Sequence, residues 1–265
     1  MTKRVISVFL CVLCVISSIS FIVSAKENKE YTSDNFLSVA DGIIAWKKAD
    51  NGSEPDGYLI NDKYLENAGT TPGDWYPIAL GRLGIQDNNE GYLAVIKDRV
   101  EERYRESGRL SAAKATEWHR IALAVLAMGG DPTNFGTDEN GAPINLIADG
   151  TYDRGKTTPL GRQGINGWIW GLITLDSMRY AVPDGAYNTR DDIIVEIISK
   201  QLSDGGFALS SDDADPDITA MAITALAPYY NSEKTYSYHR KALSADESRT
   251  VHEVVDEAVL CLSRL

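Results

Sequence analysis

The feature that most constrains this chain is an alternation between two kinds of apolar segment. The segments that begin near Trp75, Trp118, Trp168 and Ile218 are apolar on nearly every side, whereas those between them carry one charged face. A helix without a polar face has to be covered by other protein on all sides. Because the half-apolar segments can supply that cover, the alternation predicts two layers of helices, with the fully apolar helices inside.

The fully apolar segments also look like copies of one unit. Those that begin at Trp75, Trp118 and Ile218 each have alanine four residues on and leucine eight residues on, and each follows an acid (Asp74, Glu117 or Asp217). The four segments start 43 to 50 residues apart, and that period is typical of a repeated helix pair with long loops. The sequence therefore predicts helix hairpins that build either a curved α/α array or a closed α/α toroid.

Periodicity places individual helices within this scheme, and the predicted fold class is all-α. The expected helices cover residues 34–48, 74–83, 90–105, 111–128, 163–180, 190–200, 218–229 and 249–265, with short helical turns within 58–67 and 144–148. The stretch 231–247 is polar, and no helix is expected there. The last helix has an apolar face but no inner partner after it, so the chain is expected to stop inside a repeat.

The N-terminus has the layout of an export signal. Lys3 and Arg4 precede an apolar run from Val5 to Val23, and small residues follow at a plausible cleavage site, Val23-Ser24-Ala25. This pattern predicts a signal peptide at 1–25, with an uncleaved membrane anchor as the alternative. Residues 26–33 are expected to be a flexible leader, and 34–265 a single repeat domain. The predicted location is secreted or at the cell surface.

Charge and cysteine content narrow the possible partners. The net charge is −12, and loss of the signal peptide would remove Lys3 and Arg4 and make the chain more acidic. A strongly acidic surface disfavours nucleic acid and anionic lipid as partners. Cys261 is the one cysteine outside the predicted signal peptide, so the exported chain is expected to form no internal disulfide. Once the signal peptide is removed, the chain is also expected to have no membrane span.

One turn carries a resemblance to a known family. Gln201–Phe207 reads QLSDGGF and is similar to the Q-x-x-D-G-G-F turn of the prenyltransferase/squalene-cyclase repeat, while 217–229 resembles the inner helix that follows it. Residues 67–84 and 114–132 resemble segments of secreted bacterial proteins with such repeats. The resemblance covers most of 58–265. It implies an α/α toroid of about six helix pairs, so this chain would form an incomplete ring of about four and a half pairs and continue past Leu265.

The resemblance raises a catalytic possibility. Class II terpene cyclases of this superfamily carry Asp-x-Asp-Asp-Thr-Ala, in which the middle acid protonates an alkene. Here Asp215-Pro216-Asp217-Ile218-Thr219-Ala220 puts Asp217 at the donor position but replaces the third acid with Ile218. The alternative role for Asp217 is to cap a helix. A squalene/hopene-type cyclase with a degenerate acid motif at Asp215 and Asp217 is therefore the alternative function. The favoured expectation is that the chain is not an enzyme.

Metal and cofactor chemistry finds little support in the sequence. The zinc ligands of protein prenyltransferases and the Cys-Gly-Glu-Gln loop of thioester domains are absent, and His252 begins a metalloprotease-like H-E-x-x pattern that ends in Asp256. The loop 161–167 has the glycines of a nucleotide loop, but no predicted strand precedes it. Two options stay open: calcium at Asp212, Asp213, Asp215 and Asp217, and cobalamin, because vitamin B12 carriers have a similar toroid together with a β-rich domain that this chain lacks.

Parallel inner helices would bring acids and aromatic residues to one end of the array, where they make a predicted site for a ligand or partner. The alternative is that the tryptophans pack in the core and the acids cap helices. The candidate binding residues are Asp74, Trp75, Glu117, Trp118, His119, Trp168, Trp170 and Asp217. The expected function is an exported, non-catalytic module that binds an extracellular ligand, glycan or protein.

Overall fold

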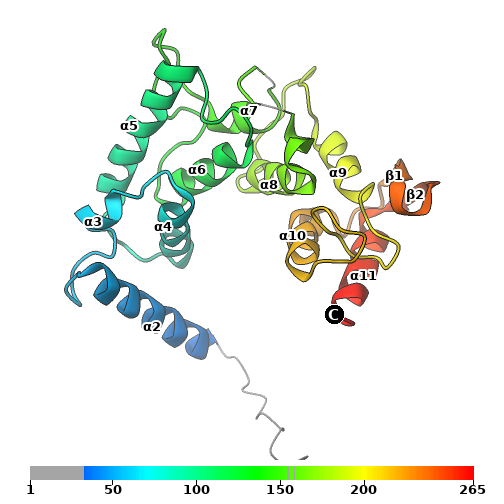
Figure 1. Ribbon diagram of the computed structural model, residues 1–265, viewed down its shortest axis with the longest axis horizontal. Helices are drawn as coiled ribbons and strands as arrows, with labels where there is room; N and C mark the ends of the chain where they lie inside the picture. Colours follow the sequence, from blue (N-terminus) through cyan, green and yellow to red (C-terminus); the bar gives the residue numbers. More distant parts are fainter. Residues whose placement is uncertain (1–32, 154, 158) are drawn as a thin grey trace, which may run out of the picture. The chain divides into compact units, whose positions relative to one another are not determined.

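The computed structural model describes residues 33–153, 155–157 and 159–265 (Figure 1). The predicted signal peptide, and the leader as far as residue 32, lie outside this part of the chain. The chain divides into two compact units, one up to Pro55 and one from Asp56 to Leu265. Among its described residues the first unit contains helix α2, Ser33–Asn51, where a helix over 34–48 was predicted.

The second unit is mostly helical, which confirms the predicted class except for one two-stranded hairpin. Its elements are α3 (Asp62–Leu65), α4 (Thr71–Leu83), α5 (Asn89–Ser107), α6 (Thr116–Ala127), α7 (Leu146–Gly150), η1 (Leu160–Gln163), α8 (Ile165–Asp176), α9 (Arg190–Ile198), α10 (Pro216–Leu226), η2 (Ala227–Tyr229), β1 (Thr235–Arg240), η3 (Lys241–Leu243), β2 (Ala245–Thr250) and α11 (Val251–Leu262). In the part of the chain that the structure describes, no helix has the length and apolarity needed to cross a membrane.

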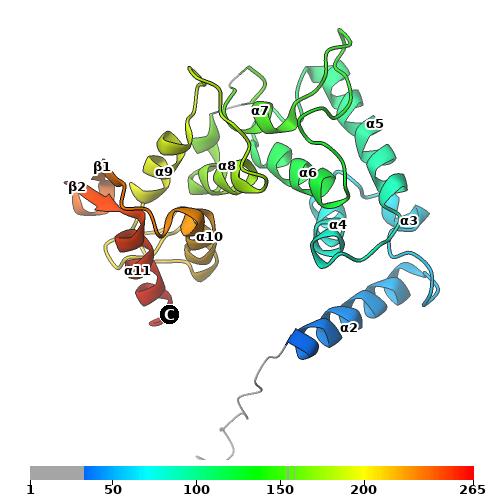
Figure 2. The same cartoon turned by 180° about the vertical axis from the view of Figure 1, so that it is seen from behind.

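The helices of the second unit form two layers. In the inner row α4 packs against α6, α6 against α8, and α8 against α10, while α7, α9 and α11 pack beside α6, α8 and α10 in turn. Helix α5 is attached by its tyrosines: Tyr92 donates a hydrogen bond to Asp74 of α4, and Tyr104 accepts one from Trp118 of α6. Figure 2 shows α5, α7 and α9 on the same side of the inner row. The described residues show no closed toroid, so the ring stays a proposal.

Burial along the inner row is uneven. The equivalent first residues Trp118 and Ile218 are 0% and 7% exposed, as the apolar pattern predicts, but Trp75 of α4 is 42% exposed. The prediction that the Trp75 segment is covered on every side is therefore wrong. The reason is that α4 is the first helix of the row in this unit, so that α6 covers one of its sides, whereas α6 and α8 each have an inner helix on both sides.

The Gln201–Phe207 turn follows α9 and connects it to α10 and α11. The fully buried side-chain amide of Gln201 donates to the carbonyl oxygens of Gly205 (2.8 Å) and of Val254 in α11 (2.9 Å). Gly205 has φ +91°, a conformation that favours glycine, and a Cβ there would lie 2.8 Å from the Glu257 oxygen of α11. The turn then delivers Phe207, whose N–H donates to the Thr219 hydroxyl of α10 (2.9 Å).

The hairpin β1–β2 lies mostly in the polar stretch 231–247, where no helix was expected. Thr235 pairs with Thr250 and Arg240 with Ala245 in an antiparallel register. Alternate residues of β1 point inward, and the last of them, Arg240, is 3% exposed and donates to the carbonyl oxygen of Gln201 (3.1 Å). Strand β2 also occupies the first residues of the helix predicted at 249–265, which begins at Val251 instead.

Candidate functional site

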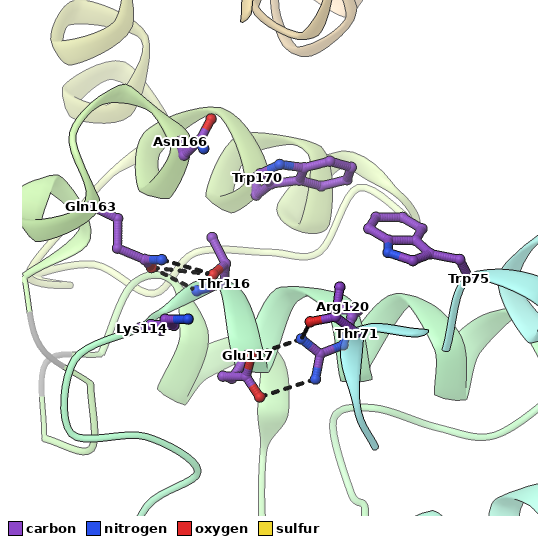
Figure 3. Close-up of a pocket in the computed structure, with 9 residues that line it drawn as sticks. All are labelled: Thr71, Trp75, Lys114, Thr116, Glu117, Arg120, Gln163, Asn166 and Trp170. Carbon is purple, nitrogen blue, oxygen red and sulfur yellow. Dashed lines mark hydrogen bonds and ion pairs between the residues drawn. The ribbon is translucent and has the colours of Figure 1, made fainter. Parts of the chain in front are cut away.

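A pocket of about 200 Å³ lies where the N-terminal parts of α4, α6 and α8 meet (Figure 3). The predicted convergence of inner-helix N-termini is therefore present for three of the four inner helices. The lining residues are Thr71 and Trp75 of α4, Thr116, Glu117 and Arg120 of α6, Asn166 and Trp170 of α8, and Lys114 and Gln163 from the segments just before α6 and α8.

Two tryptophans form one end of the pocket. The ring centroids of Trp75 and Trp170 lie 5.6 Å apart with an angle of 55° between the ring planes. The two indoles contact each other, and neither is fully buried. Part of their apolar surface therefore faces the pocket (Figure 3). Aromatic faces of this kind give a large contact area to a flat apolar group.

Arg120 forms the floor of the pocket and has no donor to spare. Its Nε donates to Asp74 (2.8 Å), Nη1 to Thr71 (3.3 Å) and Glu117 (2.7 Å), and Nη2 to the carbonyl oxygen of Gly69 (3.1 Å) and again to Glu117 (3.0 Å). An arginine has five N–H groups, and all five are used here. Arg120 therefore acts as a clamp between α4 and α6 and is not free to bind an anion.

Asp74 is the buried partner of this clamp. Its side chain is fully buried and also accepts hydrogen bonds from the Gly69 N–H and the Tyr92 hydroxyl, both at 2.7 Å. Burial raises the pKa of the Asp74 carboxyl, although the hydrogen bonds from Arg120 and Tyr92 oppose that shift. The predicted binding residue Asp74 thus lies behind the pocket and does not line it.

Glu117 does line the pocket, but neighbouring arginines already balance the charge of its carboxylate. Besides its two hydrogen bonds from Arg120, it lies 3.6 Å from a guanidinium nitrogen of Arg103. Burial by itself would raise the pKa of the Glu117 carboxyl, but its bonds to Arg120 and the nearby cations outweigh this and hold that pKa below its usual value. Glu117 is therefore a carboxylate that the protein itself holds in place.

The other end of the pocket is polar and uncharged, apart from one lysine. The side chain of Gln163 accepts a hydrogen bond from the Thr116 N–H (3.2 Å) and donates to the Thr116 hydroxyl (3.0 Å), so it caps α6, whose N-cap residue Ala115 has no polar side chain. The side-chain oxygen of Asn166 is buried and has no hydrogen-bond partner among the described residues. Lys114 is exposed beside them, and its ammonium forms no hydrogen bond or ion pair within the described chain.

Trp118 and His119, both predicted binding residues, lie in the core. The indole N–H of Trp118 donates to Tyr104 (2.7 Å), which in turn donates to Asp149 (2.6 Å). His119 is fully buried, and because the Gly150 carbonyl oxygen 2.7 Å from its Nε2 can only accept, Nε2 carries the proton. Its Nδ1 has no partner in the described structure, and burial lowers the pKa of His119 to about 4, although the Gly150 carbonyl opposes the shift.

The remaining predicted residues are also outside the pocket. Trp168 is half-buried, and its indole nitrogen lies so close to Gly161 that a Cβ there would be 2.8 Å away. Asp217 is exposed in the first turn of α10, and Asp215, not Asp217, is the N-cap, accepting a hydrogen bond from the Ile218 N–H (2.9 Å). An exposed carboxyl lacks the enclosed surroundings that a proton donor to an alkene needs.

The described part of the chain contains no cluster of side chains that could form a metal site. No group of three or more histidine, cysteine, aspartate or glutamate side chains there is arranged to hold a metal ion, and this includes the acidic segment 212–217 considered for calcium. Cys261 is a free, buried thiol. The segment 161–167 consists of most of η1, Gly164 and the start of α8, and is not a strand-to-helix phosphate loop.

Several lining residues were not singled out in the sequence. Arg120 lies three residues after Glu117, a spacing that allows an ion pair on one helix face, and this was the available signal. Thr71, Lys114, Thr116, Gln163 and Asn166 have no local signal, because they become neighbours only when three separate helices meet.

No family model, curated protein or solved structure matches this chain. The likeness of Gln201–Phe207 to the prenyltransferase/squalene-cyclase repeat therefore stays a prediction.

Proposed function

We propose that this chain is an exported, non-catalytic binding module of the prenyltransferase/squalene-cyclase repeat type, with an incomplete α/α toroid. Its ligand site is the pocket between α4, α6 and α8. The single observation that carries this proposal is the pair of partly exposed indoles, Trp75 and Trp170, facing uncommitted polar groups across one pocket. Pockets that bind small molecules combine apolar or aromatic walls with a few placed polar groups.

The proposal favours binding over catalysis because the charged groups are committed to one another. All the N–H groups of Arg120 are hydrogen-bonded to Asp74, Thr71, Gly69 and Glu117. The charged side chains of the pocket floor therefore supply neither a free general base nor a free donor for an anion. The cyclase alternative depends on Asp217, which is exposed outside this pocket.

The size of the pocket favours a small ligand. At about 200 Å³ it is smaller than the roughly 300–1,000 Å³ typical of sites for drug-sized molecules. A single six-membered ring fits this scale, whereas a corrin or a squalene chain would lie mostly outside it. Cobalamin is therefore retained as a compound to test rather than as the proposed ligand.

The test is a binding screen of the purified chain by isothermal titration calorimetry. The panel contains monosaccharides, free amino acids, nucleosides, squalene and cobalamin, and each compound that binds is titrated again against Trp75→Ala and Trp46→Ala. Trp46 is an exposed tryptophan of α2, outside the pocket, and serves as the matched control. Truncating an aromatic anchor usually costs at least about 2 kcal/mol, so Trp75→Ala should weaken binding more than about tenfold.

Trp46→Ala should leave the affinity unchanged. Binding that both variants keep would place the ligand elsewhere, and a panel without any binder would refute a small-molecule site in this pocket. Conversion of squalene to a cyclised product by the chain would replace the proposal with the cyclase alternative.

A further inference from the structure

The charges around the pocket cancel except at one residue. Asp74 and Glu117 contribute two negative charges, and Arg120 and Arg103 contribute two positive charges within ion-pair distance of them. Lys114 adds a third positive charge: after Arg120 and Arg103 it helps to lower the pKa of the Glu117 carboxyl, but its ammonium has no ion pair or hydrogen bond among the described residues. The pocket thus offers one uncompensated positive charge in a chain whose net charge is −12.

The positions of the lining residues separate an apolar end from a polar end. Figure 3 shows the indoles of Trp75 and Trp170 towards one end, with Gln163 and Asn166 towards the other and Lys114 on the Gln163 side. A ligand that uses both ends needs a flat apolar face for the indoles and a rim of hydroxyl or amide groups for the polar end.

The polar end has hydrogen-bonding capacity left over. One N–H of the Gln163 amide remains after its bond to Thr116, and the Asn166 amide lines the same end, although its side-chain oxygen is itself buried. A ligand with hydroxyl groups at this end can pair with the exposed amide hydrogens and so fix its orientation in the pocket. A sugar ring meets both requirements, because its C–H bonds make one face apolar while its hydroxyls project around the edge.

We propose, on the basis of the function proposed above, that the pocket binds a sugar ring that carries a carboxylate, as in a uronic acid, with the ring on Trp75 and the carboxylate at Lys114. A singly charged carboxylate matches the one unpaired ammonium. A phosphate monoester carries about −1.5 to −2 charges at neutral pH, which would leave excess negative charge beside Glu117. A cationic ligand would meet Lys114 and Arg120 without any free carboxylate to balance it.

The experiment is calorimetric titration of the full chain with four ring compounds at low and at high salt. The probes are glucuronate, glucose, glucose 6-phosphate and benzoate, which separate the contributions of the carboxylate, the sugar ring and the charge. Glucuronate should bind roughly three- to fivefold more tightly than glucose, since the most favourable exposed ion pairs contribute about 1 kcal/mol. This preference should shrink as salt screens the ammonium.

Substitution at Lys114 tests the assignment directly. Lys114→Gln should lower glucuronate affinity to that of glucose and leave glucose unchanged, while Lys114→Arg should keep the preference. Lys97→Gln, at an exposed lysine on α5 outside the pocket, is the matched control and should change neither affinity.

Each contrary result has a separate meaning. Equal binding of glucose and glucuronate, or a preference that survives Lys114→Gln, would overturn the carboxylate assignment. Tighter binding of benzoate than of glucuronate would overturn the sugar, and tighter binding of glucose 6-phosphate would overturn the single charge. If none of the four compounds binds, this inference is wrong, while the proposed function stands provided that another compound from the screen binds in a manner that requires Trp75.

Discussion

Acidification is expected to destabilise the second unit through His119. This side chain is fully buried in α6, with Nε2–H bonded to the Gly150 carbonyl oxygen and Nδ1 facing no partner in the described structure. A second proton would have to go on Nδ1, where the charge would be both desolvated and unpaired. Burial accordingly lowers the pKa of His119 from 6.5 to about 4.

The size and direction of the effect follow from this difference in pKa. In the unfolded chain His119 regains a pKa near 6.5, so the unfolded state binds an extra proton between about pH 6.5 and 4. The stabilisation from a neutral His119 is complete above pH 6.5 and is lost as the pH falls towards 4. At about 1.4 kcal/mol for each pH unit, the loss approaches roughly 3 kcal/mol.

Urea titrations followed by far-ultraviolet circular dichroism, at intervals from pH 7.5 to pH 4, measure this loss. Because carboxylates also begin to titrate near pH 4, the informative quantity is the difference in unfolding free energy between wild type and His119→Gln. Glutamine keeps an N–H donor for Gly150 but does not titrate. His239→Gln is the control, because His239 is an exposed strand residue whose Nδ1 lies 2.8 Å from Asp246.

The wild-type advantage over His119→Gln should decline by roughly 3 kcal/mol across the range, whereas His239→Gln should follow the wild type. Parallel curves for wild type and His119→Gln would refute the reasoning, since they would mean that His119 takes up its proton equally well in the folded state.

Asp74→Ala should lower the unfolding free energy in urea by about 3–5 kcal/mol, because it leaves Arg120 buried without its partner. The double variant Asp74→Ala/Arg120→Leu should lose less unfolding free energy than the two single variants added together, and a fully additive loss would show that the pair is not coupled. Gly81→Ala should lower the melting temperature by several degrees, since its Cβ would lie 2.0 Å from the Ala127 oxygen where α4 meets α6. Gly42→Ala, with nothing within 4 Å of its Cβ in α2, should instead raise the helix content of α2 and contribute about 0.5–1 kcal/mol. Equal effects of the two glycine substitutions would contradict the close approach at Gly81.

The helices were largely predictable from the sequence because each one is marked by its own periodicity, but their ends were less so. Helix α4 begins at Thr71, earlier than predicted, since Pro72 in its first turn is compatible with a helix start. Helix α6 begins at Thr116, later than predicted, because the Ser111 hydroxyl accepts hydrogen bonds from the N–H groups of Ala113 and Lys114 and holds a turn there.

The hairpin and much of the site depend on contacts that no local pattern records. Strand β1 does alternate, with Tyr236 and Tyr238 inward, and that alternation was a missed signal. Strand β2 is polar after Ala245 and is held by its partner strand and by Arg249, which donates to Glu257 of α11 (2.9 Å). In the pocket, the aromatic and acidic residues stood out, but the roles of Arg120 and Gln163 depend on helices that are distant in sequence.

The saturated guanidinium of Arg120 has a consequence for how a ligand would be received. The hydrogen bonds of Arg120 already join the first turns of α4 and α6, so these two walls of the pocket are pre-organised before a ligand binds. Ligand binding therefore carries no entropy cost for immobilising Arg120. On the α8 wall, Trp170 and the side-chain oxygen of Asn166 have no such hydrogen bonds among the described residues, so adjustment to different ligands falls to these side chains. Selectivity among related molecules would then depend on how these α8 side chains adjust.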